Sequence, residues 1–233
     1  MKKILIFYGA YGGGHLAAAK SIKEYIDNNY ENVQTEMIDC IEYINKYLNK
    51  LSTTAYKEMA KKAPWIWKRV YSNSDHGALA KISETSNKLM AKKLNVLIQE
   101  YEPDLVISTH PFSNQMCTEL KKNHKIRCKI ATVLTDMAPH NQWLVNHEYI
   151  DYFFVANKQM KDSLSDLGIA DFKIFVTGIP LSSRFLENFD RESIFKEFHL
   201  DSSKTTVLFF AGRRIWFRKK KNSLSFSCIN SII

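Results

Sequence analysis

The stretch FYGAYGGGHLAA, residues 7–18, decides the fold that we expect for this chain. Its first residues complete the run KILIFY, whose continuous apolar character predicts a strand buried on both faces. After the glycines, apolar residues recur at three- and four-residue spacing (Leu16, Ala19, Ile22, Ile26), which predicts an amphipathic helix. Strand, glycine loop and helix form a βα unit, and open α/β sheets place ligands at the carboxyl ends of such strands.

The loop itself holds four of the chain's eight glycines. Glycine lets the backbone approach a ligand closely, and the first amides of the next helix suit an anion or a polar head group. A Walker loop is excluded because His15 and Leu16 stand where it needs lysine and a hydroxyl, and the dinucleotide pattern G-x-G-x-x-G also fails. The candidate binding residues of the loop are Gly12, Gly13 and Gly14.

His15 ends the loop and falls in the first turn of the predicted helix. The helix dipole lowers the pKa of a histidine there and favours the neutral ring, which can take a proton from a hydroxyl. The residue pattern leaves two interpretations open, a general base or a histidine that only caps the turn.

The net charge of +9 does not indicate nucleic-acid binding. Residues 213–233 hold six Lys and Arg and no acid, which leaves 27 basic against 24 acidic side chains in residues 1–212, a net charge of +3. The four cysteines (Cys40, Cys117, Cys128, Cys228) have no metal-binding spacing and fit a reducing cytoplasm. No apolar run approaches the roughly 20 residues of a membrane span, and the six-residue run at the N-terminus is too short for a signal peptide.

Strand and helix signals alternate along most of the chain, which predicts a Rossmann-like α/β domain, a parallel sheet with helices on both faces, over residues 1–180. Further strands are expected at VQTEMID, DLVISTH, KIATVLTD, YFFVA and KIFVTGIP, and further helices near 79–101, 113–123 and 157–167. DRESIFKEFHL then predicts a helix and TTVLFFAG a strand, the start of a second α/β unit over residues 181–212.

Residues 56–71, YKEMAKKAPWIWKRVY, interrupt the alternation. Tryptophan and tyrosine favour a lipid interface, and lysine and arginine favour anionic head groups. Alternatively, the aromatic residues belong to the core and the cations form a solvated face. The candidate membrane contacts are Trp65, Ile66, Trp67, Lys68 and Arg69.

Polar residues gather at the ends of three predicted strands, at His15, at Thr109 and His110, and at Thr135 and Asp136. The carboxyl ends of parallel strands share one edge of the sheet, so His15, His110 and Asp136 are expected to converge on one cleft. The alternative is three separate caps, each satisfied locally.

The motifs YGAYGGGHLAAAKSI, LVISTHPF, TDMAPHNQWL, DYFFVAN and VTGIPL resemble, in this order, the N-terminal half of the monogalactosyldiacylglycerol synthases and bacterial processive diacylglycerol glucosyltransferases. This family is similar to the peptidoglycan glycosyltransferase that makes lipid II. The resemblance implies a GT-B arrangement of two Rossmann-like domains, the first taking diacylglycerol at the membrane surface and the second binding the UDP-sugar. It also implies an inverting hexosyltransferase of glycolipid biosynthesis that needs no cofactor and no catalytic metal.

Carried over residue by residue, the resemblance makes His15 the base that deprotonates the acceptor and Asp136 its partner in orientation or proton handling. It places His140 and Trp143, with His110, on the acceptor and lipid side. The family's proline after that histidine is Asn141 here, which leaves the geometry of this loop open. The resemblance also favours the interpretation of residues 56–71 as a membrane-contacting segment. The expected partners are diacylglycerol and an anionic membrane surface, on the inner face of the cell membrane in the cytoplasm.

After TVLFFAG the family continues into a glycine loop of the kind G-G-E-F-G-L-G-K, whereas this chain continues RRIWFRKKK. Codons for G-E-F-G-L-G-K, read from their third base, encode R-I-W-F-R-K. We therefore expect residues 213–233 to be a frameshifted, disordered basic tail, the donor domain to be truncated, and the chain to be inactive alone. The alternative function is a non-catalytic lipid-binding module of the membrane surface.

Overall fold

A computed structural model describes residues 1–10, 13–44 and 78–207. The chain divides into two compact units, residues 1–188 and residues 189–233. Gly12, the predicted membrane contacts Trp65, Ile66, Trp67, Lys68 and Arg69, and the predicted tail 213–233 lie outside the described residues. The domain boundaries at residues 180 and 212 stay predictions.

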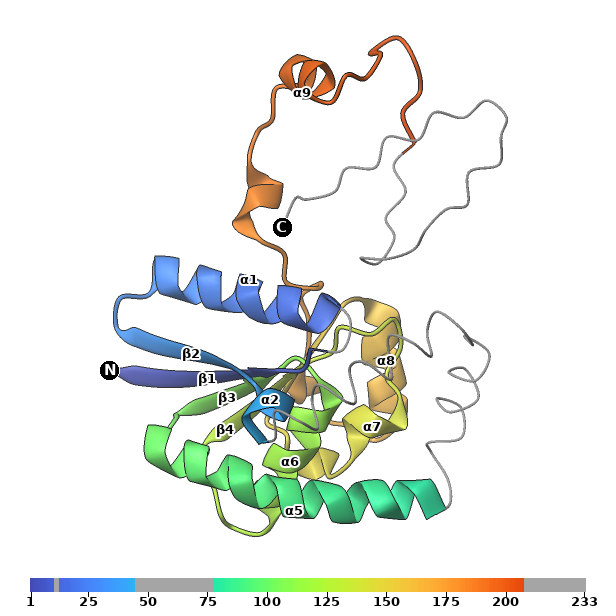
Figure 1. Cartoon of the computed structure of the whole chain (residues 1–233). Coiled ribbons are helices and arrows are strands. Elements are labelled where there is room, and N and C mark those ends of the chain that lie inside the picture. The colour runs from blue at the N-terminus through green and yellow to red at the C-terminus, as the bar shows by residue number, and fades with distance from the viewer. Residues whose placement is uncertain (11–12, 45–77, 208–233) are drawn as a thin grey trace. The chain divides into compact units, whose positions relative to one another are not determined.

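The first unit is built on one six-stranded sheet in which every paired strand runs parallel (Figure 1). The strands are β1 (Lys2–Tyr8), β2 (Val33–Asp39), β3 (Leu105–Ser108), β4 (Lys129–Val133), β5 (Tyr152–Val155) and β6 (Ile174–Val176). Their order is β2-β1-β3-β4-β5-β6, so the chain moves to one side of β1 for β2 and to the other side for β3. The reversal makes the carboxyl ends of β1 and β3 the topological switch point of the sheet, where α/β folds bind ligands.

Helices cover both faces of the sheet. Among the described residues, the helices of this unit are α1 (Gly14–Asn29), α2 (Cys40–Ile44), α5 (Ala78–Tyr101), α6 (Pro111–Lys122), α7 (Asn141–Leu144) and α8 (Lys158–Asp166). Short 3-10 turns follow at η1 (His147–Tyr149), η2 (Asp171–Lys173) and η3 (Ser183–Leu186). The Rossmann-like α/β class expected from the sequence is therefore confirmed, and so are the helices expected near 79–101, 113–123 and 157–167.

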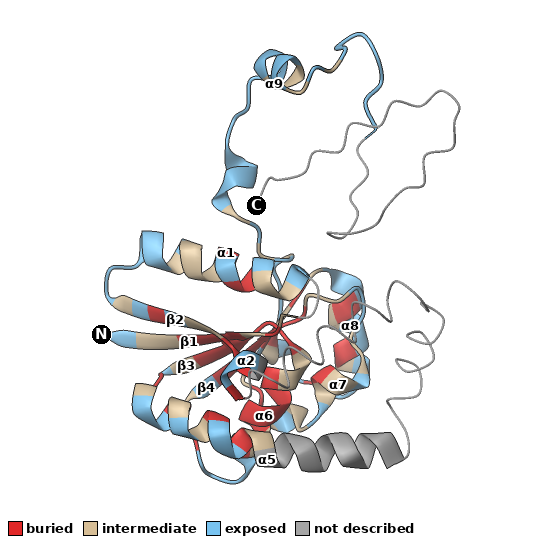
Figure 2. Ribbon diagram, in the orientation of Figure 1, coloured by how far each residue is buried: buried red, intermediate tan, exposed pale blue. Residues whose placement is uncertain are grey.

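Alternate residues of each strand separate the core into two layers. Leu5 and Phe7 of β1 face a large cluster that contains side chains of α5, α6 and α8, whereas Ile6 faces a smaller cluster with Ala19 of α1. Figure 2 shows the buried residues concentrated in the strands and on the helix faces turned toward them. Two buried faces explain why the strands are continuously apolar in the sequence.

The described part of the second unit contains α9 (Arg191–Glu197), which lies within the predicted helix DRESIFKEFHL. Its N-cap is Asp190, whose carboxylate accepts hydrogen bonds from the amides of Glu192 and Ser193. Residues 205–207, the beginning of the predicted strand TTVLFFAG, are irregular, and the rest of that strand lies outside the described residues.

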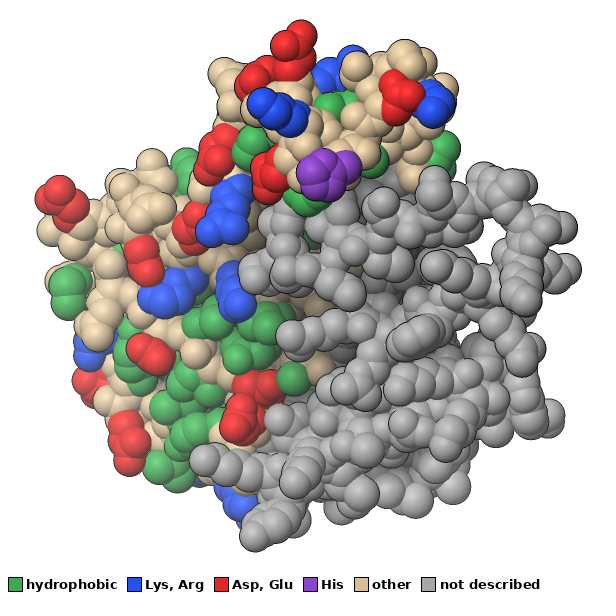
Figure 3. Space-filling model, turned by 45° about the horizontal axis from the view of Figure 1, so that its top comes forward, with side chains coloured by type: hydrophobic (Ala, Val, Ile, Leu, Met, Phe, Trp, Pro, Cys, Tyr) green, Lys and Arg blue, Asp and Glu red, His purple; other side chains and the backbone are tan. Residues whose placement is uncertain are grey.

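Acidic and basic side chains of the described residues are interspersed on the face shown in Figure 3. Across the described residues as a whole, several charged side chains are paired, as in Lys2 with Asp104 at 2.7 Å and Lys158 with Asp162 at 2.8 Å. This distribution agrees with the small net charge of residues 1–212. Within the described residues, no helix is long and apolar enough to span a bilayer.

Candidate active site

The glycine loop leads from β1 into α1, and one of its glycines is required by close packing. A Cβ atom on Gly9 would lie 3.1 Å from Cγ and Cδ2 of the His110 imidazole. Gly13, which forms the N-cap of α1, and Gly14, its first residue, have no atom within 4 Å of the position that a Cβ would take. Gly9 thus lets the end of β1 pass against His110, whereas Gly13 and Gly14 leave open space at the start of the helix.

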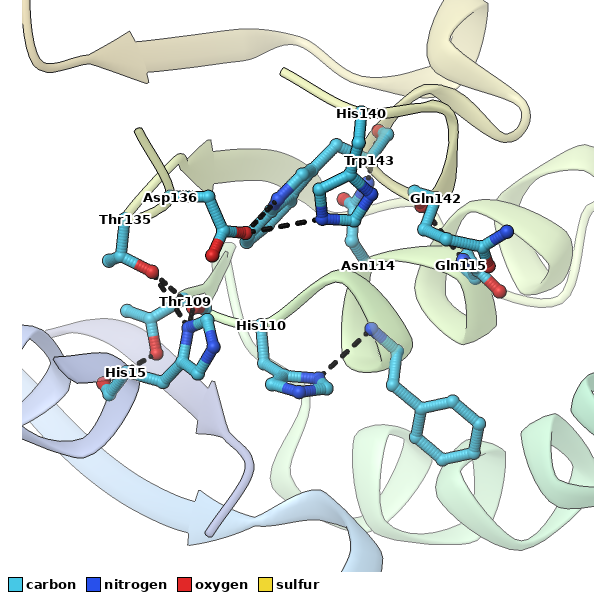
Figure 4. A network of polar contacts seen from close by, with 11 residues as sticks. His15, Thr109, His110, Asn114, Gln115, Thr135, Asp136, His140, Gln142 and Trp143 are labelled. Atoms are coloured by element: carbon cyan, nitrogen blue, oxygen red, sulfur yellow. Dashed lines mark hydrogen bonds and ion pairs between the residues drawn. The ribbon is translucent and has the colours of Figure 1, made fainter. Parts of the chain in front are cut away.

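His15 lies in the first turn of α1, and the contacts of its ring define its tautomer (Figure 4). Nδ1 lies 2.6 Å from the backbone carbonyl oxygen of Thr109 and 2.7 Å from Oγ1 of Thr135. A carbonyl oxygen only accepts hydrogen bonds, so Nδ1 carries the proton that it receives. In the neutral ring Nε2 is then the nitrogen with a free lone pair, and within the described residues no hydrogen bond to it is found.

The charge state of His15 follows from its surroundings. Burial lowers the pKa of His15, while the hydrogen bond to Thr109 and the negative charge of Asp136 oppose that effect in part. The net direction is downward, so the ring is neutral near pH 7. A neutral imidazole with a bare Nε2 is the form that can act as a general base.

Thr109 also holds the backbone beneath this ring. Its hydroxyl donates to the carbonyl oxygen of His15 at 2.9 Å, and its amide donates to the carbonyl oxygen of Phe7 at 2.9 Å. Thr109 is fully buried at the end of β3, so the start of α1 is tied to the neighbouring strand.

His110 takes both of the roles that the sequence left open. Its Nδ1 accepts a hydrogen bond from the Phe112 amide at 3.1 Å and so caps α6. Its ring also meets the ring of His15 edge-on, with 4.6 Å between the centroids. Burial, followed by the charge of His15, lowers the pKa of His110 to about 3, and the ring is therefore neutral.

Asp136 is held by the loop that follows β4. Its Oδ2 accepts a hydrogen bond from Nε1 of Trp143 at 2.6 Å and lies 3.3 Å from Nε2 of His140. Burial favours the protonated acid, but the contacts with His140 and Trp143 prevail and lower the pKa of Asp136. Asp136 is thus a carboxylate beside His15, with which it makes no hydrogen bond in the described part of the chain.

The contacts of Trp143 and Asp136 bear on two expectations. Trp143 is predicted on the acceptor side, but its side chain is completely buried, so its link to the site is the indole N–H that it donates to Asp136. Asp136 is expected to be the partner of His15 in orientation or proton handling; the oxygens at Nδ1 of His15 belong to Thr109 and Thr135, and Asp136 acts on the ring through its charge. His15, His110 and Asp136, which were expected to lie near one another, come from the carboxyl ends of β1, β3 and β4, and His140 lies beside Asp136 (Figure 4).

A buried polar layer behind the site was not predicted. Asn114 of α6 donates to the carbonyl oxygen of Trp143 at 3.1 Å and accepts from the Thr132 hydroxyl at 2.6 Å. Gln115 donates to the carbonyl oxygen of Gln142 at 2.8 Å. The feature of the sequence that could have indicated this layer is the run of polar residues Ser113, Asn114 and Gln115 in a predicted helix. All three are buried in α6. This layer fixes α7 and with it the indole of Trp143.

The site brings together the histidines His15, His110 and His140 and the carboxylate of Asp136. Within the described residues, no group of three or more His, Cys, Asp or Glu side chains could hold a metal ion. Residues 15–181 match the family model described as "Monogalactosyldiacylglycerol (MGDG) synthase". The chain belongs to this family.

Two curated relatives of this MGDG synthase family member come from bacteria. A processive diacylglycerol beta-glucosyltransferase of Staphylococcus epidermidis is 30% identical over 214 residues, which are 91% of this chain and 52% of the relative. A protein of the same description from Bacillus cereus is 31% identical over 216 residues, 90% of this chain and 53% of the relative. The chain spans about half the length of the curated relatives it matches.

Solved structures also align with the chain. A lipopolysaccharide outer core galactosyltransferase aligns with a TM-score of 0.45 and 15% identity, over 76% of this chain and 45% of that one. A UDP-GlcNAc 2-epimerase of Methanocaldococcus jannaschii aligns with a TM-score of 0.46 and 16% identity, over 86% of this chain and 54% of that one.

Proposed function

We propose that the protein transfers a hexose from a UDP-sugar to diacylglycerol with inversion, and that this chain supplies the acceptor half. The observation that carries the proposal is the neutral His15 with a bare Nε2 at the switch point of the sheet. The matched family, named for monogalactosyldiacylglycerol synthase, and the relatives, named diacylglycerol beta-glucosyltransferases, supply the substrate class.

In the proposed reaction, Nε2 of His15 takes the proton of the diacylglycerol hydroxyl. The hydroxyl oxygen attacks the anomeric carbon of the sugar, and the bond from that carbon to the UDP oxygen breaks with its electron pair on UDP. The imidazolium that forms lies near the Asp136 carboxylate, whose negative charge favours a protonated His15. No metal ion or cofactor is required in this scheme.

The donor side belongs to a second Rossmann-like domain in the GT-B arrangement that we propose. Holding the two substrates together is worth on the order of 7–11 kcal/mol in favourable cases. We therefore expect residues 1–233 alone to show no sugar transfer in an assay with radiolabelled UDP-glucose or UDP-galactose and vesicles containing diacylglycerol. Turnover by this chain alone would contradict the two-domain scheme.

A fusion protein tests the role of His15 directly. Residues 1–204 would be joined to the C-terminal part of the Staphylococcus epidermidis relative, beginning after the residue that aligns with Lys204 of this chain. Sugar transfer to diacylglycerol would then be measured. We expect activity in the fusion and a loss of at least about a hundredfold in its His15→Ala variant, because a general base contributes roughly that much or more. Tyr25→Ala, on the exposed part of α1, is the control and should keep full activity. Equal activity of the fusion protein and its His15→Ala variant would refute the proposal.

We also propose that the protein acts on the inner face of the cell membrane, held there by anionic lipid through the segment of residues 56–71. Its composition supports this: two tryptophans and two tyrosines lie among five lysines and arginines. The test of this attachment is given in the Discussion.

A further inference from the structure

Nδ1 of His15 lies between two oxygens that come from neighbouring strand ends. The carbonyl oxygen of Thr109 lies at 2.6 Å and the hydroxyl oxygen of Thr135 at 2.7 Å. The two oxygens lie 3.5 Å apart. One N–H can be shared by both, because the hydroxyl oxygen of Thr135 accepts while its own proton is directed to the carbonyl of Thr109. The three groups form a closed hydrogen-bonded ring.

Thr135 is well anchored for such a task. It follows Leu134, which is buried and whose amide donates to the carbonyl oxygen of Phe154 at 2.9 Å. A threonine side chain has few accessible χ1 rotamers, so its hydroxyl stays where the backbone places it. The oxygen that meets His15 is therefore fixed by β4 and β5.

Asp136 has a different position. Its Oδ2 is occupied by Trp143 and His140, and it influences His15 through its charge. A histidine's tautomer is set by the hydrogen bond that its other nitrogen makes. The orienting groups are consequently the oxygens at Nδ1, and the carboxylate is not one of them.

We propose that Thr135 is a positioning residue for His15: with the Thr109 carbonyl it holds the ring in the Nδ1–H tautomer, with Nε2 turned away from the backbone. Asp136 tunes the affinity of that ring for a proton but does not choose the tautomer. The proposal rests on the proposed function only where it gives Nε2 a substrate to act on.

The experiment uses residues 1–233 with 15N-labelled histidine and long-range 1H–15N NMR spectra, in which protonated and bare ring nitrogens resonate apart. In the unmodified chain we expect Nδ1 of His15 to resonate as a protonated nitrogen and Nε2 as a bare one. Thr135→Val keeps the shape and removes the hydroxyl, but the Thr109 carbonyl still favours a proton on Nδ1. The two signals should therefore move toward each other only in part, as the more weakly held ring turns and samples the other tautomer. Thr135→Ser should restore the original pattern.

Asp136→Asn separates the two roles. It should leave the tautomer of His15 unchanged and lower the pKa of His15, because the charge that raises it is gone. Titration must follow His110 and His140 as well, since both face His15. Backbone amide spectra establish that each variant is folded, and Thr135→Ala replaces the valine variant if that one does not fold.

Unchanged His15 signals in Thr135→Val, or a tautomer change in Asp136→Asn, would overturn the proposal. Sugar transfer is not part of this readout. If the fusion protein lacks activity while the tautomer responds as expected, the proposed function fails and the positioning role stands. If the fusion protein is active and the His15 signals do not respond, the proposed function stands and the positioning role of Thr135 fails.

Discussion

Burial decides the charge of two neighbouring histidines, His15 and His110, whose rings lie 4.6 Å apart. Two imidazolium ions at this distance would repel each other, and removal from water penalises each of them. The pKa of both is lowered by burial, that of His110 to about 3. Both neutral rings therefore depend on a folded site, and this links protonation to stability.

The pH dependence of folding should report His110. The unfolded chain binds a proton at the ordinary histidine pKa near 6.5, well above the folded value of about 3. The stabilising contribution is therefore complete above about pH 6.5 and decreases as the pH falls toward 3. We expect a loss of about 2 kcal/mol in the free energy of unfolding between about pH 7 and about pH 5.

Urea unfolding of wild type and His110→Asn at several pH values measures this loss. Asparagine can still cap α6 but does not titrate, so its variant should lose much less stability over the same range. His15 remains in both proteins and contributes in the same direction. Parallel pH curves for the two proteins would show that His110 is not the group responsible.

Trp143→Phe tests the contact that holds Asp136. The variant keeps an aromatic ring in the core and removes the N–H that lies 2.6 Å from Oδ2. We expect the free energy of unfolding to decrease by about 1.5–3 kcal/mol, the range for a hydrogen bond to a charged group. The pKa of Asp136 should rise, because the indole N–H stabilises its charged form. A double-mutant cycle with Asp136→Ala, which removes the acceptor, isolates the contact from the effect of the smaller ring. A coupling energy near zero would contradict a stabilising hydrogen bond between Trp143 and Asp136.

At the scale of elements, the passage from β1 to α1 depends on different glycines for different reasons. Gly9→Ala would place a methyl group 3.1 Å from the His110 ring, which is itself held by its cap to α6. We expect this overpacking to lower the free energy of unfolding by about 1–3 kcal/mol.

Gly14→Ala is the matched control, because nothing lies within 4 Å of its Cβ position and it begins a helix. It should be neutral or stabilising by up to about 1 kcal/mol. Thermal or urea unfolding of the two variants compares them in one experiment. Equal stability would show that Gly9 is not under steric constraint.

At the scale of the whole molecule, membrane attachment is the property to measure. Flotation with vesicles of neutral or anionic lipid should show binding that increases with anionic lipid and decreases with salt. Lys68→Gln with Arg69→Gln should weaken it by about 1 kcal/mol for each cation. Trp65→Ala with Trp67→Ala should weaken it on both kinds of vesicle, since these residues would contact the apolar layer.

The control variant for the charge pair is Lys125→Gln with Arg127→Gln. These two exposed cations precede β4, at the edge of the sheet opposite the candidate active site. They carry the same charge as Lys68 and Arg69 and should leave binding unchanged. Equal weakening by both pairs would mean that attachment depends on net charge and not on residues 56–71.

The sequence was sufficient for the six strands and for helices α1, α5, α6 and α8, because apolar periodicity, glycines and prolines act locally along the chain. The short helices α2 and α7 were not expected. It also indicated that His15, His110 and Asp136 would meet, since parallel strands end at one edge. Fold class and family followed from these motifs.

Tertiary structure alone decided what each polar group contacts. The partner of His15 at Nδ1 is a backbone carbonyl 94 residues away, and a carbonyl leaves no mark in a sequence because every residue carries one. Which oxygen meets His15, and that Asp136 turns to the buried indole of Trp143, depend on distances of tenths of an ångström between strand ends. Residue spacing determines which side chains share an edge, and only packing determines their hydrogen bonds.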